Sequence, residues 1–155
     1  MKSVREAPPR FHARWSALSR RYRYRLATPG SPAPRAWVLD RMPDAGALRD
    51  GLARVAAAPT MRGFCSEAKD APALTTAALE TDGDALTVTL EAPAFGKREV
   101  RNLVASLVNV ALGRAAPSML ATLAGSRWPY HANAAPPNGL TLEAVCYPPD
   151  LDPFV

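Results

Sequence analysis

The stretch FHARWSALSRRYRYR, residues 11–25, carries the pattern that predicts the fold. From Ser19 onward, arginines alternate with aromatic or apolar residues, and a period of two is typical of a β-strand. The apolar face of this strand is predicted to hold Tyr22, Tyr24 and Leu26. Arg21, Arg23 and Arg25 fall on the other face. We therefore predict a strand of an antiparallel sheet with one apolar side and one cationic side.

Rings on one side of a strand and guanidinium groups on the other suit the wall of a nucleic-acid cleft. Arginines contact phosphates, and aromatic rings stack on bases. The candidate RNA-binding residues of this segment are Arg14, Arg20, Arg21, Arg23 and Arg25. The same pattern also fits an ordinary half-buried strand whose arginines are only solvated.

The charge of the chain is concentrated at its start. The first 25 residues hold eight Lys or Arg and one acidic residue, a net charge of +7. Because the whole chain has a net charge of +5, the remaining 130 residues carry −2. A concentrated basic segment attracts polyanions and gains from counterion release, which favours a nucleic acid as partner. An acidic protein partner fits the aromatic residues less well.

Composition narrows the class of protein. The chain has 155 residues, 48% of them hydrophobic, enough for one domain with its own core. Its uncharged runs are too short for a membrane span, and no secretory leader is recognised, so we expect a cytoplasmic protein. Cys65 and Cys146 form no C-x-x-C pattern and are interpreted as structural or incidental thiols. The sequence shows neither a metal-ligand cluster nor a glycine loop that could cradle phosphates.

The rest of the chain predicts an alternation of helices and strands. After the first strand we expect a helix from Asp44 to Pro59, a short strand or turn at 61–66, strands at 75–81 and 85–90, helices at 97–112 and 118–124, and a strand at 140–146. The order βαββαβ predicts an α+β fold, ferredoxin-like, with helices packed on one face of an antiparallel sheet.

Three blocks of sequence carry a family resemblance. They are FHARWSA at 11–17 with RYRY at 21–24, AxAF at 92–95 with VRNLV at 100–104, and GLTLxxVxYP at 139–148. In these blocks the chain resembles the tRNA pseudouridine synthases of the TruA type. Their patterns are F-H-A-R-F-S-A…R-x-Y-x-Y, A-x-x-F…M-V-R-N-I-V-G and G-L-Y-L-x-x-V-x-Y-P.

The resemblance implies an isomerase that converts uridine to pseudouridine in the anticodon arm of tRNA, without a metal or an organic cofactor. By motif, Tyr22 would pack against the target base and Arg101 would pair with the catalytic aspartate. In the family this aspartate lies in a G-R-T-D-A-G motif before the F-H-A-R block. Residues 1–155 resemble only the C-terminal domain, so we expect the N-terminal half and its aspartate to be absent, and no catalytic residue is assigned.

Several positions depart from the family pattern. RMPDAG at 41–46 contains Asp-Ala-Gly, but its arginine-to-aspartate spacing is one residue too long, and Asp44 is predicted to cap a helix. The family's H-D-F-x-x-F-R stretch is reduced to RGFCS at 62–66, and Leu74 stands where a basic residue is expected. Lys97, Arg98 and Glu99 replace the more usual His-His-Met.

The residues alone leave other roles open. From the residues alone a core role beside Tyr24 is favoured for Tyr22, and Arg101 would fit as a solvated residue at the rim of its helix. His12 and His131 lack an acidic partner at a telling spacing. Three functions are therefore weighed: part of a tRNA pseudouridine synthase that is inactive alone, a non-catalytic RNA-binding module, and one half of a split enzyme. The candidate partners are tRNA, a second copy of the chain, and a separately encoded N-terminal half.

Overall fold

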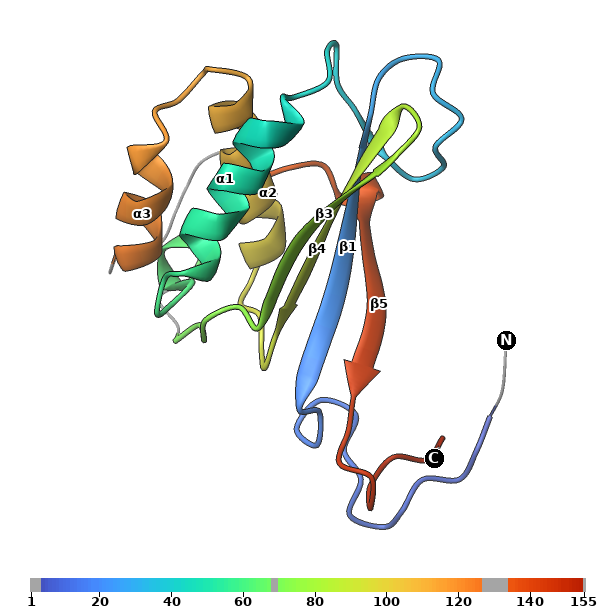
Figure 1. Cartoon of the computed structure of the whole chain (residues 1–155). Helices are drawn as coiled ribbons and strands as arrows, with labels where there is room; N and C mark the ends of the chain where they lie inside the picture. The colour runs from blue at the N-terminus through green and yellow to red at the C-terminus, as the bar shows by residue number, and fades with distance from the viewer. Residues whose placement is uncertain (1–3, 68–69, 127–133, 155) are drawn as a thin grey trace.

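The strand predicted from the alternating arginines is β1, Ser19–Ala27, and it lies inside a five-stranded sheet (Figure 1). The computed structural model describes residues 4–67, 70–126 and 134–154. β1 pairs antiparallel with β4, Ala85–Ala92, on one side and with β5, Leu140–Cys146, on the other. Each of these strands is close to its predicted range, since the period of two and the Gly83 turn define them well.

The sheet has the strand order of a ferredoxin-like fold. β3, Thr76–Asp82, pairs antiparallel with β4, which gives the order β5-β1-β4-β3. The remaining strand, β2, Trp37–Val38, runs parallel to the last two residues of β1. The predicted α+β fold with an antiparallel sheet is confirmed.

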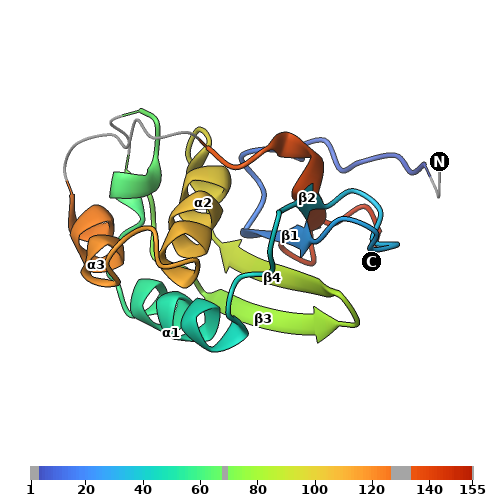
Figure 2. The ribbon, with the colours of Figure 1, turned by 90° about the horizontal axis from the view of Figure 1, so that it is seen from above.

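Three helices lie on one side of the sheet. They are α1, Ala45–Ala56, α2, Glu99–Ala111, and α3, Ser118–Gly125. Figure 2 shows from above that α3 packs beyond the other two, against α1 and the turn at Arg62–Phe64. Core residues of the sheet include Tyr24, Leu26, Val88 and Leu90, and those of the helices include Leu48, Leu52, Leu103, Leu107 and Leu120. The apolar face of β1 thus packs under the helices, because its alternating residues all point to that side. No helix in the described part of the chain is both long and apolar enough to cross a bilayer.

The structure decides the local conformation of two segments, 44–46 and 61–66. Asp44 caps α1, because its Oδ1 accepts a hydrogen bond from the Ala47 N–H at 2.7 Å. The Asp-Ala-Gly at 44–46 is therefore a helix start, as predicted. The segment 61–66 holds a 3₁₀ turn, η1, Arg62–Phe64, and a second such turn, η2, Pro137–Gly139, leads into β5.

Candidate functional site

Tyr22 and Arg101 line the same cavity, of about 200 Å³, between β1, β5 and the start of α2. The other residues that line it are Phe95, Gly96, Arg98, Glu99, Val100 and Leu140. The rings of Tyr22 and Phe95 meet edge to face, with centroids 5.2 Å apart and planes at 88°. Such a contact orients both rings, and it gives the cavity an aromatic wall.

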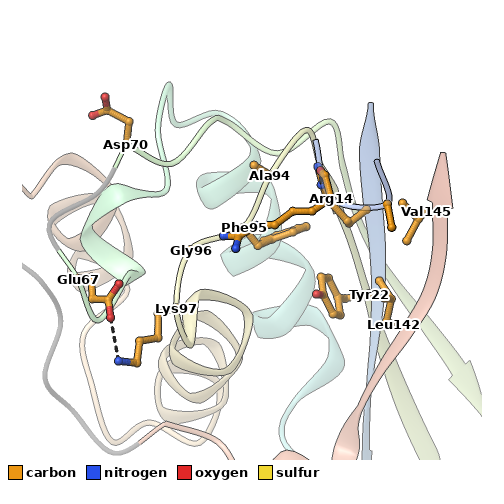
Figure 3. A pocket seen from close by; sticks show the side chains of 12 residues that line it. Arg14, Tyr22, Glu67, Asp70, Ala94, Phe95, Gly96, Lys97, Leu142 and Val145 are labelled. Atoms are coloured by element: carbon orange, nitrogen blue, oxygen red, sulfur yellow. Dashed lines mark hydrogen bonds and ion pairs between the residues drawn. The ribbon is translucent and has the colours of Figure 1, made fainter. Parts of the chain in front are cut away.

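A larger hollow of about 540 Å³ adjoins this cavity and shares Tyr22, Phe95 and Gly96 with it. In Figure 3 the side chains of Tyr22, on β1, and Phe95, on the loop before α2, extend toward each other and meet in its wall. Arg14, Arg20 and Lys97 bring positive charge to its lining, Glu67 and Asp70 bring negative charge, and Lys97 pairs with Glu67 at 2.8 Å. The hollow therefore combines rings with basic groups, as a site for single-stranded RNA requires.

Arg101 is held by the backbone rather than by an acid. Its Nε donates to the carbonyl oxygen of Ala135 at 2.6 Å, and the Ala135 N–H donates to the Arg101 carbonyl at 3.1 Å. Within the described residues, no carboxylate forms an ion pair with Arg101. These two bonds fix the segment before η2 against α2. They also leave the outer nitrogens of the guanidinium available for a carboxylate from elsewhere.

The five candidate RNA-binding arginines divide between two surfaces. Arg14 and Arg20 line the larger hollow with Tyr22. Arg20 also donates to the carbonyl oxygens of Ala17, Pro93 and Arg14, so it fixes the turn that presents Arg14. The other three, Arg21, Arg23 and Arg25, alternate with the core residues of β1 and lie on the sheet face away from the helices.

On that far face each arginine meets a carboxylate. Arg21 pairs with Glu91 at 2.8 Å, and Arg25 approaches Asp82 at 3.7 Å. The pKa of Glu91 is lowered by its hydrogen bond from the Ser19 hydroxyl and then by Arg21. The far face thus carries charge pairs rather than an unopposed basic row.

Arg23 lies between two acids, one on β3 and one on β5, and the acid on β5 stands at an irregularity of the sheet. The register of β1 with β5 shifts between Arg21 and Tyr22, which leaves Glu143 without a partner residue on β1. Its carboxylate lies 3.2 Å from Arg23, and Glu80 lies 3.5 Å from the same guanidinium. A role of Arg21, Arg23 and Arg25 in RNA binding stays a prediction, and it requires exchange of these carboxylates for phosphates.

His12 forms no acid–base pair within the described part of the chain. The His12 ring stacks on Trp15, and its Nδ1 accepts hydrogen bonds from the backbone N–H groups of Arg14 and Trp15 at 3.2 Å. His12 therefore shapes the turn before β1. His131 lies outside the described residues. Among those residues, no group of three or more His, Cys, Asp or Glu is arranged to hold a metal ion.

Sequence reasoning did not mark six of the eight residues that line the cavity, and Phe95 and Glu99 are two of these six. Phe95 belongs to one of the three family blocks, AxAF at 92–95. This position in the block could have indicated it as a site residue. Glu99 is 1% exposed, and its Oε2 accepts from the Gly96 N–H at 2.5 Å and from the Cys65 thiol at 3.2 Å. Burial raises the pKa of Glu99 to about 7. The signal here was a charged residue at a position where the family pattern has methionine.

Comparison with known proteins decides the family. Residues 62–148 match the family described as tRNA pseudouridine synthase. The chain belongs to this family. The family predicted from the three sequence blocks, with a match to the C-terminal part of the TruA type, is thus confirmed.

Individual members of the tRNA pseudouridine synthase family match almost the whole chain. It is 37% identical to the tRNA pseudouridine synthase A of Cutibacterium acnes, over 98% of this chain and 59% of that protein. For the proteins of the same name from Methylococcus capsulatus and Streptomyces avermitilis, the identities are 31% and 33%, over 96% of this chain in both cases. The chain spans between half and two thirds of the length of these relatives, 58% and 55% in the last two.

Proposed function

We propose that this chain takes part in pseudouridine formation in the anticodon arm of tRNA by holding the target uridine between Tyr22 and Arg101. The observation that carries the proposal is that Tyr22, Phe95 and Arg101 line one cavity in a member of this family. The reactive aspartate comes from outside these 155 residues, whose sequence holds no G-R-T-D-A-G motif. It belongs either to the same polypeptide or to a second chain.

The reaction requires that the uridine leave its stack. The N1–C1′ bond breaks, the uracil turns, C5 bonds to C1′, the hydrogen on C5 leaves as a proton, and N1 takes up a proton. Tyr22 holds the loosened base with the face of its ring, which Phe95 orients through the edge contact at 5.2 Å. Arg101 pairs with the incoming aspartate through its outer nitrogens, since its Nε is already bonded to Ala135.

The RNA backbone is held by the basic groups around the larger hollow. Arg14 is the first candidate, because its exposed side chain lines this hollow beside Tyr22. Arg20 acts mainly by fixing the turn that carries Arg14. This role in tRNA modification also fits the cytoplasmic location expected from the sequence.

Binding of unmodified tRNA over a range of salt concentrations tests the proposal. We expect affinity that falls steeply as salt rises, because phosphate contacts release counterions. We also expect weaker binding after Tyr22→Ala. If affinity is independent of salt, or if Tyr22→Ala leaves it unchanged, the cavity is not the RNA site.

The second candidate is an RNA-binding module without chemistry. The rings and basic groups that line the larger hollow support it equally. It predicts the same tRNA affinity, but no turnover when a polypeptide that carries the motif is added. A dimer of this chain would likewise lack the motif in both copies.

A further inference from the structure

Trp15 carries an indole ring that the described part of the chain leaves almost uncovered. The residue is 81% exposed. Its one ring contact among the described residues is with His12, with centroids 4.2 Å apart and planes at 14°. This stack covers one face of the indole, so the other face is open to solvent. An exposed ring buries little apolar area, and it therefore adds little to the stability of the fold.

The turn that carries Trp15 is held by hydrogen bonds of its own. The His12 N–H donates to the Ser16 hydroxyl, and the Ser16 N–H donates to the His12 carbonyl, both at 2.9 Å. The Nδ1 of His12 accepts from the N–H groups of Arg14 and Trp15, which fixes the imidazole against the indole. The free protein thus already meets the cost of ordering the ring, which is what a preorganised binding surface requires.

Two contacts from outside the turn anchor it to the sheet. The Tyr147 hydroxyl donates to the Ala13 carbonyl at 2.9 Å, and the Tyr147 ring meets Phe11 edge to face with centroids 4.9 Å apart. Arg20 of β1 donates to the carbonyl of Arg14. The turn is therefore joined both to β1 and to the segment after β5. A ring that is fixed this firmly and is open on its outer face indicates a binding surface.

The position and charge of this surface favour a nucleic acid as its ligand. Trp15 directly follows Ala13 and Arg14, which line the larger hollow together with Tyr22. Because consecutive Cα atoms are only about 3.8 Å apart, a strand with one base in the hollow reaches the indole with a neighbouring nucleotide. The first 25 residues have a net charge of +7, which attracts a polyanion. A ring beside a cation is the combination that binds single-stranded RNA.

We propose that Trp15 is a stacking platform for an unpaired base of the RNA, next to the uridine that enters the cavity. The open face of the indole binds this base, and Arg14 contacts a phosphate between the two nucleotides. The inference rests on the proposed function, since it requires that the target uridine lie beside Tyr22. Every base has a π-face, so Trp15 adds affinity and positions the strand without selecting its sequence.

The test compares two single strands of equal length, oligouridylate and an abasic strand with the same ribose-phosphate backbone. Both strands offer phosphates, and only the first offers bases. Trp15→Ala removes the ring, and Trp15→Phe keeps a smaller one. Phe154→Ala, which removes an exposed ring from the tail, is the matched control. Fluorescence anisotropy of the labelled strands at fixed low salt measures the dissociation constants, and circular dichroism confirms that each variant is folded.

Tryptophan fluorescence gives a second measurement on the same samples. A base that stacks on an indole quenches its emission. Of the other two tryptophans, Trp37 packs against the core and meets the ring of Tyr24, and Trp128 lies outside the described residues. Both are present in the unaltered chain and in Trp15→Phe. The difference in quenching between these two proteins therefore reports on Trp15.

We expect Trp15→Ala to lower the affinity for oligouridylate roughly fivefold or more, and to leave the affinity for the abasic strand nearly unchanged. Phe154→Ala should change neither affinity. Trp15→Phe should keep most of the affinity and lose the quenching.

Three results would overturn the inference. In the first, Trp15→Ala binds oligouridylate as tightly as the unaltered chain, which would leave the ring to a protein partner. In the second, it loses affinity for both strands equally. In the third, oligouridylate causes no quenching beyond that seen with Trp15→Phe. Tyr22→Ala in the same assay tests the proposed function separately, because a loss with Tyr22→Ala but not with Trp15→Ala overturns this inference alone.

Discussion

Tyr22 on β1 and Arg101 on α2 line one cavity, and the ring of Phe95 lines it with them, 5.2 Å from the ring of Tyr22. The pairing of β1 with β4 and β5 fixes the side to which Tyr22 points. α2 is fixed in turn, because the Asn102 amide donates to the Phe64 carbonyl at 2.6 Å. The core of the fold therefore sets the relation between the two residues.

Replacing Tyr22 by alanine should weaken the binding of single-stranded RNA. Stacking of a base on a ring contributes about 1–3 kcal/mol, so we expect a loss of roughly fivefold or more. Phe154→Ala, which removes an exposed ring from the tail, is the control and should change little. Fluorescence anisotropy with a labelled oligouridylate measures both. Equal losses in the two variants would show that Tyr22 has no special part in binding.

The two surfaces that carry arginines should differ in their importance for tRNA. Arg14→Ala and Arg23→Ala each remove one positive charge, from the hollow and from the far face respectively. We expect Arg14→Ala to lower tRNA affinity roughly fivefold, and Arg23→Ala to lower it less, because Glu80 and Glu143 already oppose its charge. Filter binding at low salt measures the two constants. A larger loss for Arg23→Ala would place the RNA on the far face of the sheet.

Glu99 should make the free energy of unfolding depend on pH. An exposed glutamate titrates near 4.5, and burial raises the pKa of Glu99 to about 7. Between these values the folded state binds more protons than the unfolded state, so stability falls as pH rises. The full loss is about 3 kcal/mol.

Urea denaturation at pH 5 and at pH 8 measures this loss. Glu99→Gln cannot ionise and should show a smaller decrease between the two pH values. The carboxylate of Glu91, whose pKa is lowered, does not change stability between pH 5 and pH 8. It stabilises the fold while it is ionised, and it is protonated only at lower pH. If the decrease is the same in the variant and in the unaltered chain, Glu99 does not titrate as described.

The turn η1 should tolerate no side chain at Gly63. A Cβ at this position would lie 1.5 Å from the backbone oxygen of Leu123 in α3, which cannot move without shifting the helix. Gly63→Ala should therefore lower the free energy of unfolding by more than about 2 kcal/mol. Gly125→Ala, at the end of α3 with open space around the added Cβ, should change it by less than about 1 kcal/mol. Thermal melts measure the stability of both variants. Similar stabilities would contradict the close packing at η1.

Much of the fold could be predicted because it depends on local patterns. The alternation in β1, the cap at Asp44 and the turn at Gly83 each specify their element from a few neighbouring residues. The 3₁₀ form of η1 is less predictable. Its Gly63 is required because the backbone of Leu123, in a helix far along the chain, leaves no room for a side chain.

The candidate site was predicted only in part, for a similar reason. The family blocks indicated Tyr22 and Arg101, and the structure brings these two together. The partners of the arginines on the far face come from three other strands or turns, so they do not follow from the alternation of β1. The burial of Glu99 depends on its contact with Cys65. The two residues are 34 positions apart, and no pattern in the sequence indicates that they meet.

The most direct test of the central claim is tritium release from tRNA that carries uridine labelled at C5. We predict no release by this chain alone. Release should appear after mixing with a polypeptide that carries the G-R-T-D-A-G half of a TruA-type enzyme, and it should be lost again with Tyr22→Ala or Arg101→Ala. Release by the purified 155-residue chain alone, or undiminished release from the mixture with either variant, would contradict the account.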